Sequence, residues 1–198
     1  MEALENHLID AENGIIKLLD TPFNKKKLEP GYIKAYLPGV RENGGQYTHA
    51  AIWAILAYTI IGFGDKAVEY FRMINPIEHS RTKESAIKYK VEPYVISADI
   101  YGAENLKGKG GWTWYTGAAS WFCKVGIENI LGLKIENGVL KLSPCISTKW
   151  QEYSIKYKYK TSIYNIQVKN PNGRCTGENQ KLYLNRTRNK RKRNKVRR

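Results

Sequence analysis

Features that would assign this 198-residue chain to several common classes of protein are scarce or missing. Its three cysteines, Cys123, Cys145 and Cys175, are widely spaced and form no CxxC pair, so the sequence predicts neither a zinc site nor a disulfide framework. We interpret them as buried free thiols in a reducing compartment. The longest apolar run, residues 50–62, is shorter than the roughly 20 residues that span a bilayer. The polar, acidic residues 1–14 do not resemble a signal peptide, which favours a cytoplasmic protein.

Acidic residues are also scarce, with 18 against 33 lysines and arginines, which gives a net charge of +15. Residues 174–198 contain 11 of the basic residues and one acid, so the remainder carries 22 basic and 17 acidic residues. This tail has almost no apolar periodicity and cannot offset the entropy cost of ordering, so we expect it to be disordered. Nine basic residues among its last 13 would bind polyanions without sequence selectivity.

Helical signals come first along the chain and strand signals second. An early helix is expected to break at Asn13-Gly14, and four further helices are expected at residues 48–61, 65–74, 93–101 and 116–131. Asp65 is expected to cap the second of these four, and Pro93 suits the first turn of the third. After Gly132 the pattern alternates, which predicts a hairpin around Asn137-Gly138 and strands at residues 152–160 and 161–170. This order predicts an α+β protein.

The stretch RENGGQYTHAAIWAILAY, residues 41–58, concentrates polar groups directly ahead of an apolar helix. Helix N-termini present unpaired N–H groups and the positive end of a dipole, so they hold anions. His49 lies in the first turn of this helix, and Thr116-Gly117 opens another, each entrance being preceded by a glycine pair. The two entrances together favour a shared anion site, whereas each taken singly also fits ordinary capping and turn chemistry.

Aromatic and acidic residues near these entrances are further candidates. Trp112 and Trp114 straddle a threonine before the last expected helix and are placed to line a pocket, with Trp114 a candidate sugar contact. Glu42 and Glu92 are the carboxylates of interest, although Glu92 also suits a dipole-complementing role before a helix. The remaining histidines, His7 and His79, have no metal-ligand spacing, and we interpret them as surface residues. No metal site is expected.

Four segments together resemble a known family: GYIKAYLPGVRENGGQYTHAAIWA, NPIEHSRT, YKVEPYV and GGWTWYTGAASWFCKVGIENILGL. They are similar to the C-terminal part of glycoside hydrolase family 94, which includes cellobiose and chitobiose phosphorylases and the phosphorylase-like end of cyclic β-1,2-glucan synthases, and most similar to the last group. The resemblance implies the last helical hairpins of an (α/α)6 toroid barrel at residues 1–132. The first antiparallel strands of a jelly-roll-like β-domain, a partial β-sandwich, would follow at residues 133–173, ahead of the basic tail, residues 174–198.

The resemblance also implies a chemistry, namely inverting phosphorolysis of β-linked glucans with inorganic phosphate as co-substrate and no cofactor. It assigns phosphate contacts to His49, Thr116 and Gly117, and contacts to the sugar or the pocket wall to Glu92 and Gln46. The general acid of the family is an aspartate in a motif containing Trp-Asn-Asp, and none of the five tryptophans here is followed by Asn-Asp. No catalytic residue is therefore assigned in this chain, since the acid is expected upstream.

We therefore expect a fragment of a glycoside phosphorylase or hexosyltransferase, inactive alone and in need of the missing N-terminal part of the enzyme. A broken gene, shifted in frame near Gly173, would explain why the resemblance gives way to the basic tail. Two alternatives remain open: a non-catalytic carbohydrate-binding remnant, and a nucleic-acid-binding protein that acts through the tail.

Overall fold

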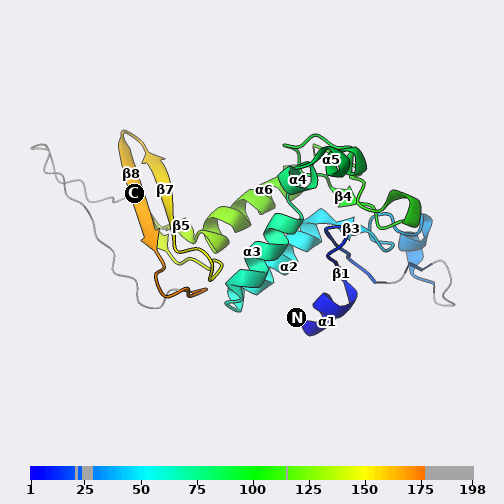
Figure 1. The fold of residues 1–198 in the computed structure, drawn as a ribbon, viewed down its shortest axis with the longest axis horizontal. Coiled ribbons are helices and arrows are strands. Elements are labelled where there is room, and N and C mark those ends of the chain that lie inside the picture. Colours follow the sequence, from blue (N-terminus) through cyan, green and yellow to red (C-terminus); the bar gives the residue numbers. More distant parts are fainter. Residues whose placement is uncertain (21, 24–28, 115, 177–198) are drawn as a thin grey trace, which may run out of the picture. The chain divides into compact units, whose positions relative to one another are not determined.

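The structure is a computed structural model that describes residues 1–20, 22–23, 29–114 and 116–176 (Figure 1). From residue 177 onward, the predicted disordered tail lies outside the described residues. Helices and small antiparallel sheets make up the described part, so the architecture is α+β, as predicted. No helix within these ranges is long and apolar enough to cross a membrane.

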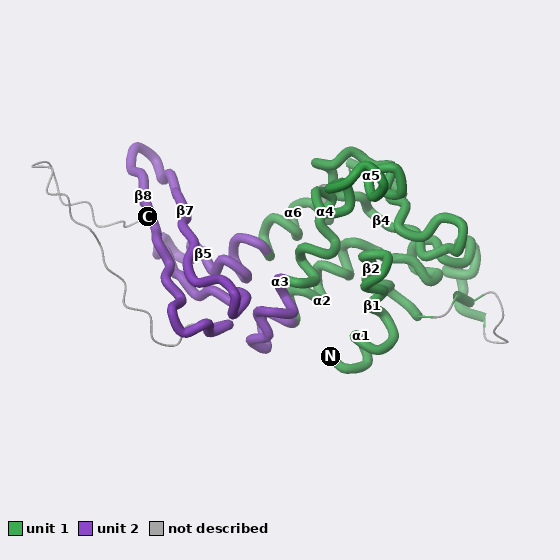
Figure 2. The backbone as a smooth tube through the Cα atoms, in the orientation of Figure 1, with its two compact units in different colours: residues 1–57, 69–125 green, residues 58–68, 126–198 purple. Residues whose placement is uncertain are grey.

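The chain divides into two compact units, coloured separately in Figure 2. Among the described residues, unit 1 contains those of 1–57 and 69–125, and unit 2 contains residues 58–68 and 126–176. Unit 2 thus includes the turn between two consecutive helices of the sequence, α2 (Thr48–Ile60) and α3 (Gly64–Met73).

Unit 1 begins with a short helix and a hairpin. Helix α1 (Glu2–His7) is followed by strands β1 (Ile9–Asp10) and β2 (Ile15–Ile16), which pair antiparallel. Gly14 lies in the turn between the strands with a left-handed φ of +67°. Asn13-Gly14, where the early helix was expected to break, therefore lies in a hairpin turn. The early helix already ends at His7. The 3-10 helix η1 (Gly31–Ala35) comes next.

Helix α2 confirms the helix predicted at residues 48–61. Its sequence, THAAIWAILAYTI, is apolar on nearly every side. Ile52 and Ile55 are completely buried, whereas Trp53 is 53% and Ile60 is 73% exposed. A helix that is apolar all round is typical of an element covered on several sides, so α2 has an apolar face that the described residues leave open.

Three helices follow α2 in the sequence. Helix α3 agrees within one residue with the predicted helix at 65–74. Helix α4 (Pro76–His79) is capped by Asn75, whose side chain accepts a hydrogen bond from the Ile77 N–H. Helix α5 (Lys83–Tyr89) begins with a reciprocal capping box between Thr82 and Ser85 and was not predicted.

The helix predicted at residues 93–101 is wrong. Residues 95–100 are buried without interruption and end in strand β4 (Asp99–Ile100), which pairs with β3 (Gln46–Tyr47). Proline suits the first turn of a helix, but it equally suits the turn found here. Continuous burial with backbone partners on both sides selects an extended interior segment.

The last helix of unit 1 runs on into unit 2. After the 3-10 helix η2 (Glu104–Leu106), helix α6 (Thr116–Lys124) passes directly into the π-helix η3 (Val125–Ile130). The two elements together occupy the range predicted as one helix at 116–131. Gly132 ends the helical stretch with a left-handed φ of +78°, a conformation that glycine adopts at little cost.

Unit 2 contains the two predicted hairpins. Strands β5 (Leu133–Glu136) and β6 (Val139–Leu142) are joined by Asn137-Gly138, and both turn residues have a positive φ, as a tight hairpin requires. Strands β7 (Glu152–Tyr159) and β8 (Ser162–Lys169) pair over their whole length, with Tyr157 opposite Tyr164.

Asp65 has a different role from the predicted helix cap. The helix begins at Gly64, and the Asp65 carboxylate accepts hydrogen bonds from the Ser147 hydroxyl at 2.6 Å and the Thr148 N–H at 2.9 Å. The hydrogen bond from Ser147 is the main cause that lowers the pKa of Asp65. The side chain therefore ties the first turn of α3 to residues 147–148 within unit 2.

The cysteines follow the prediction only in part. All three are free thiols, but only Cys145 is buried, and its burial raises its pKa to about 11. Cys175 is partly exposed and Cys123 is exposed, so the prediction of buried thiols is wrong for Cys123.

Candidate functional site

Strand β4 joins the two segments that lead into α2 and α6. On one side it pairs with β3, directly ahead of α2. On the other side Ile100 bridges to Gly110, and the Gly111 N–H donates to the Asp99 carbonyl at 2.9 Å. Because neighbouring strands lie about 4.8 Å apart, the two entrance segments are separated by roughly 10 Å. Strand β4 therefore holds the glycine-containing segments that lead to α2 and α6 on its two sides.

The glycines of these segments allow the backbones to approach closely. Gly44 has a φ of +92°, and its carbonyl would collide with a Cβ at Gly102. A Cβ at Gly111 would collide with the Asp99 carboxylate. Both collisions involve groups that cannot easily move, so larger residues would push the entrance segments apart.

His49 lies between the two helices. It belongs to the first turn of α2, and its ring centroid is 5.0 Å from that of Trp53 and 5.9 Å from that of Trp121 on α6. Its Nε2 atom is buried and has no hydrogen-bond partner among the described residues. A buried polar atom without a partner is costly, so this nitrogen is suited to contact a ligand.

The first turn of α6 is open. Gly117 is exposed, and a Cβ built at this position would meet no atom within 4 Å. The backbone N–H groups of a first helical turn have no partner within the helix, so a ligand can reach them here. Thr116 begins the helix, although its side chain lies outside the described residues.

Glu92 and Trp114, two of the predicted sugar contacts, lie together. The indole N–H of Trp114 donates to Glu92 Oε1 at 3.4 Å, and Tyr94 packs edge-on against the indole at 6.4 Å. Trp114 is 68% exposed and has a φ of +63°, which is unusual for a bulky residue. The strained backbone presents a large aromatic surface next to a carboxylate.

Gln46 is placed differently from these two residues. It is completely buried, its Oε1 accepts from the Ile16 N–H at 2.8 Å, and its Nε2 donates to Thr48 Oγ1 at 3.1 Å. Both ends of the amide are therefore occupied. Gln46 fits the predicted role in the pocket wall, since a direct sugar contact would require these bonds to break.

The sequence analysis missed Arg41 and Asp99. The Arg41 guanidinium lies 4.8 Å from the centre of the Trp112 ring, and its Nε is 4.0 Å from Asp99 Oδ2. Burial is the main cause that raises the pKa of Asp99, and the nearby Glu42 carboxylate acts in the same direction. Glu42 itself has a buried Oε2 with no hydrogen-bond partner in the part of the chain that the structure describes. Asp99 was missed because its segment was predicted to be a helix. Arg41 could have been found from its position in the sequence, because it is next to Glu42, which the sequence analysis had selected.

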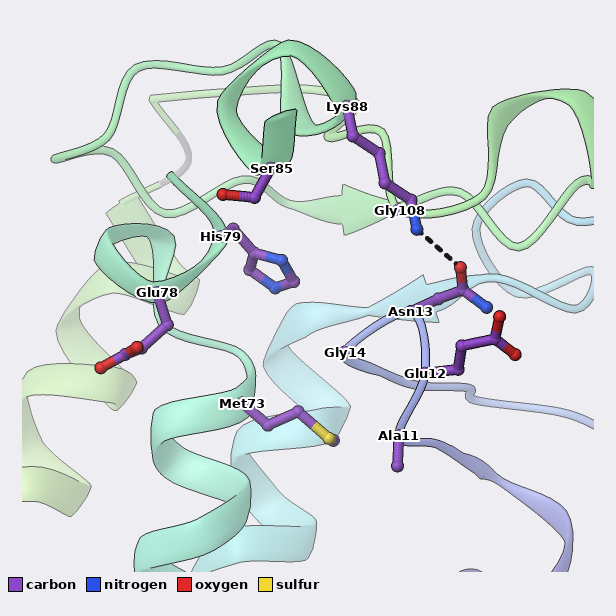
Figure 3. Close-up of a pocket in the computed structure, with 10 residues that line it drawn as sticks. All are labelled: Ala11, Glu12, Asn13, Gly14, Met73, Glu78, His79, Ser85, Lys88 and Gly108. Atoms are coloured by element: carbon purple, nitrogen blue, oxygen red, sulfur yellow. Dashed lines mark hydrogen bonds between the residues drawn. The ribbon is translucent and has the colours of Figure 1, made fainter. Parts of the chain in front are cut away.

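A hollow in unit 1 is lined in part by His79 (Figure 3). This cavity of about 220 Å³ is lined by residues from the β1–β2 turn, α4 and α5, among them Asn13, Glu78 and Lys88. His79 stacks on Tyr89 at 4.7 Å, and its Nε2 is buried without a partner among the described residues. The prediction that His79 is a surface residue is wrong, because the fold packs α4 against the hairpin turn at Gly14. His7 is exposed, as predicted.

The chain belongs to the glycosyl hydrolase 94 superfamily, because the model of the catalytic domain of that superfamily matches residues 1–132. It is 45% identical over 168 residues to the cyclic beta-(1,2)-glucan synthase NdvB of Rhizobium meliloti (strain 1021), covering 85% of this chain and 6% of that protein. It is 30% identical over 148 residues to the N,N'-diacetylchitobiose phosphorylase of Vibrio furnissii, covering 74% of this chain and 18% of that protein.

A third relative is the 3-O-beta-D-glucopyranosyl-beta-D-glucuronide phosphorylase of Paenibacillus borealis. It is 31% identical over 173 residues, which cover 82% of this chain and 22% of that protein. The chain therefore spans less than a quarter of the length of each of these three relatives. The predicted family is confirmed, and it is one of glycoside phosphorylases and glucan synthases.

The partly buried His79 predicts a specific pH dependence of stability. Burial, aided by the charge of Lys88, lowers its pKa from 6.5 to about 4. His79 therefore binds a proton near pH 6.5 in the unfolded chain but only near pH 4 in the folded chain. The free energy of unfolding accordingly decreases as the pH falls from about 6.5 to about 4. The full effect is on the order of 3 kcal/mol.

The measurement is urea unfolding between pH 7 and pH 4 for the wild type, His79→Phe and His7→Phe. Phenylalanine keeps an aromatic ring against Tyr89 but cannot take up a proton, so His79→Phe is expected to lose this part of the pH slope. His7→Phe, at an exposed position, is expected to keep the slope. Equal slopes in all three proteins would contradict the assignment.

Proposed function

We propose that this chain is part of a glycoside phosphorylase or hexosyltransferase that cleaves β-linked glucans with inorganic phosphate and inversion at the anomeric carbon. The observation that carries this proposal is the buried, unpartnered Nε2 of His49 at the entrance of α2, with its ring against Trp121 of α6. Two helix entrances next to an unpaired nitrogen suit a phosphate ion, because both N–H donors and helix dipoles favour an anion.

In this proposal each residue has a separate task. His49 donates a hydrogen bond to one phosphate oxygen through Nε2, while the Thr116 hydroxyl and the Gly117 N–H hold others. Phosphate is the nucleophile, so the chain needs to orient it rather than to activate it by removing a proton. The general acid that protonates the leaving oxygen would come from a part of the enzyme upstream of this chain. No catalytic residue and no cofactor are assigned here.

The sugar would contact the aromatic surface of Trp114. Sugar rings present C–H groups that pack on an indole face, and a carboxylate accepts hydrogen bonds from the hydroxyls at the ring edge. Glu92 lies within 3.4 Å of the indole N–H and is suited to this second task. Gln46 would support the wall from behind by fixing the backbone at Ile16 and the hydroxyl of Thr48.

The finer architecture is also part of the proposal. Residues 1–132 would be the last helical hairpins of an (α/α)6 barrel, and residues 133–173 the first strands of a jelly-roll-like domain. The open face of α2 supports an incomplete barrel, since the apolar side chains of Trp53 and Ile60 are 53% and 73% exposed on this helix. Its partner would be the N-terminal part of the same kind of enzyme, present in the cytoplasm.

The open face of α2 predicts self-association of the isolated chain. Ile60→Ser is expected to reduce it, because Ile60 is 73% exposed and its removal from the surface costs the folded chain little. Ile87→Ser is the matched control, since Ile87 on α5 is 59% exposed but lies outside the α2 face. Sedimentation velocity would measure the self-association of both variants. An equal decrease of self-association in the two variants would contradict a role for the α2 face.

The phosphate assignment predicts ligand-dependent stability. Phosphate at about 100 times its dissociation constant would stabilise the folded chain by about 2.7 kcal/mol. His49→Ala is expected to lose at least half of the resulting rise in Tm, because the buried nitrogen that contacts phosphate is gone.

The measurement is thermal unfolding in phosphate against chloride of equal ionic strength. His7→Ala controls for the loss of an exposed imidazole and is expected to respond like the wild type. A rise in Tm that is the same in His49→Ala as in the wild type would rule out the assignment of His49.

Binding of nucleic acid through the tail is separable from the site. A truncation should follow Thr176, because the Cys175 carbonyl accepts from the Ile146 N–H and Thr176 bridges to Cys145. Removal of residues 177–198 is expected to abolish salt-dependent retention on heparin and to leave phosphate protection unchanged. Persistent retention after truncation would place the polyanion-binding surface elsewhere in the chain.

A further inference from the structure

Asp99 contacts both entrance segments of the site through its backbone. It is 2% exposed and lies in β4, the strand between the two segments. Its partner in the β3–β4 ladder is Tyr47, directly ahead of α2. Its carbonyl accepts from the N–H of Gly111, in the segment that leads to α6.

The side chain of Asp99 repeats this connection. Oδ1 accepts a hydrogen bond from the Trp112 N–H at 3.0 Å, and Oδ2 lies 4.0 Å from Arg41 Nε. Trp112 belongs to the segment that leads to α6, and Arg41 to the segment that leads to α2. The Arg41 guanidinium also lies over the Trp112 ring, so Trp112 is contacted by Asp99 through its backbone N–H and by Arg41 through its ring.

A carboxylate at this position is unfavourable for stability alone. Burial raises the pKa of Asp99, and of the charged groups that face it, only Arg41 favours the ionised form while Glu42 opposes it. An asparagine would accept the same hydrogen bond from Trp112 without a buried charge. The carboxylate also requires glycine at position 111, where any Cβ would collide with it. This combination is expected where function rather than stability selects the residue.

We propose that Asp99 is a positioning residue that holds the α2 and α6 entrances at the separation needed to bind one anion between them. The proposal rests on the phosphate site proposed above. Asp99 does not touch the ligand; it acts on His49 through Arg41 and β3, and on Gly117 through Trp112.

The test uses the full chain with three substitutions. Asp99→Ala removes the side-chain contacts with both segments, whereas Asp99→Asn keeps an oxygen for the Trp112 N–H and removes the charge that faces Arg41. Ser97→Ala is the control, because Ser97 is equally buried and bonds to Tyr89 rather than to either entrance segment. Two quantities are measured: the phosphate concentration for half-maximal thermal protection, and amide hydrogen exchange of residues 44–49 and 110–118.

Asp99→Ala is expected to raise the half-maximal phosphate concentration by about tenfold and to speed exchange in both segments. Asp99→Asn is expected to fall between Asp99→Ala and the wild type, and it remains informative if Asp99→Ala does not fold. Ser97→Ala is expected to lower Tm without changing the phosphate concentration. An equal effect of Ser97→Ala and the Asp99 variants on both quantities would overturn the inference.

Failure of the proposed function is distinguishable from failure of this inference. If the wild type shows no phosphate protection, the phosphate site is wrong, and hydrogen exchange alone decides whether Asp99 holds the two segments. If the wild type is protected and His49→Ala is not, but both Asp99 variants match the wild type, the phosphate site stands and the positioning role is wrong.

Discussion

The organisation of unit 1 depends on satisfying the backbone of one interior segment. Residues 95–100 are buried throughout, so their N–H and C=O groups need partners within the protein. Thr48 and Trp112 supply them on either side of Ala98, by hydrogen bonds of 2.9 and 2.6 Å. Thr48 is the first residue of α2, and Trp112 lies in the segment that leads to α6. The hydrogen bonds that satisfy this buried backbone therefore also fix the positions of the segments that carry the candidate site.

The buried polar side chains around this segment divide into two groups. Asn43 and Gln46 are at most 1% exposed and fully engaged: the Asn43 amide bonds to the Phe23 N–H and the Tyr36 carbonyl, and Gln46 bonds to Ile16 and Thr48. His49 and Glu42, from the same eight-residue stretch, residues 42–49, each leave a buried polar atom without a partner among the described residues. Engaged groups fix loops, whereas unengaged ones are available to a ligand. Residues 42–49 therefore combine side chains that fix the fold with side chains that are available to a ligand.

The sequence predicted the elements whose signals are local. The strands of unit 2 follow from period-two alternation and the Asn137-Gly138 turn, and α2 follows from its apolar run. The helix predicted at residues 93–101 was wrong because Pro93 is also compatible with a helix start. The β3–β4 hydrogen bonds that favour an extended conformation come from residues about 50 positions earlier, which local signals do not reveal. Asp99 was missed for the same reason. The pairing of Trp114 with Glu92 was also out of reach, because it depends on a positive φ at a tryptophan.

The β3–β4 pairing has a consequence for how the chain acquires its native state. Gln46 pairs with Ile100, so the ladder closes a loop of more than fifty residues, whereas the α4–α5 region and both hairpins of unit 2 form from near neighbours. Closure of long loops costs entropy before any contact repays it, which makes such pairings late events on a folding pathway. The ring contact between His49 and Trp121 of α6 joins residues that are still farther apart in the sequence. The local helices and hairpins are therefore expected to form before the long-range contacts of unit 1.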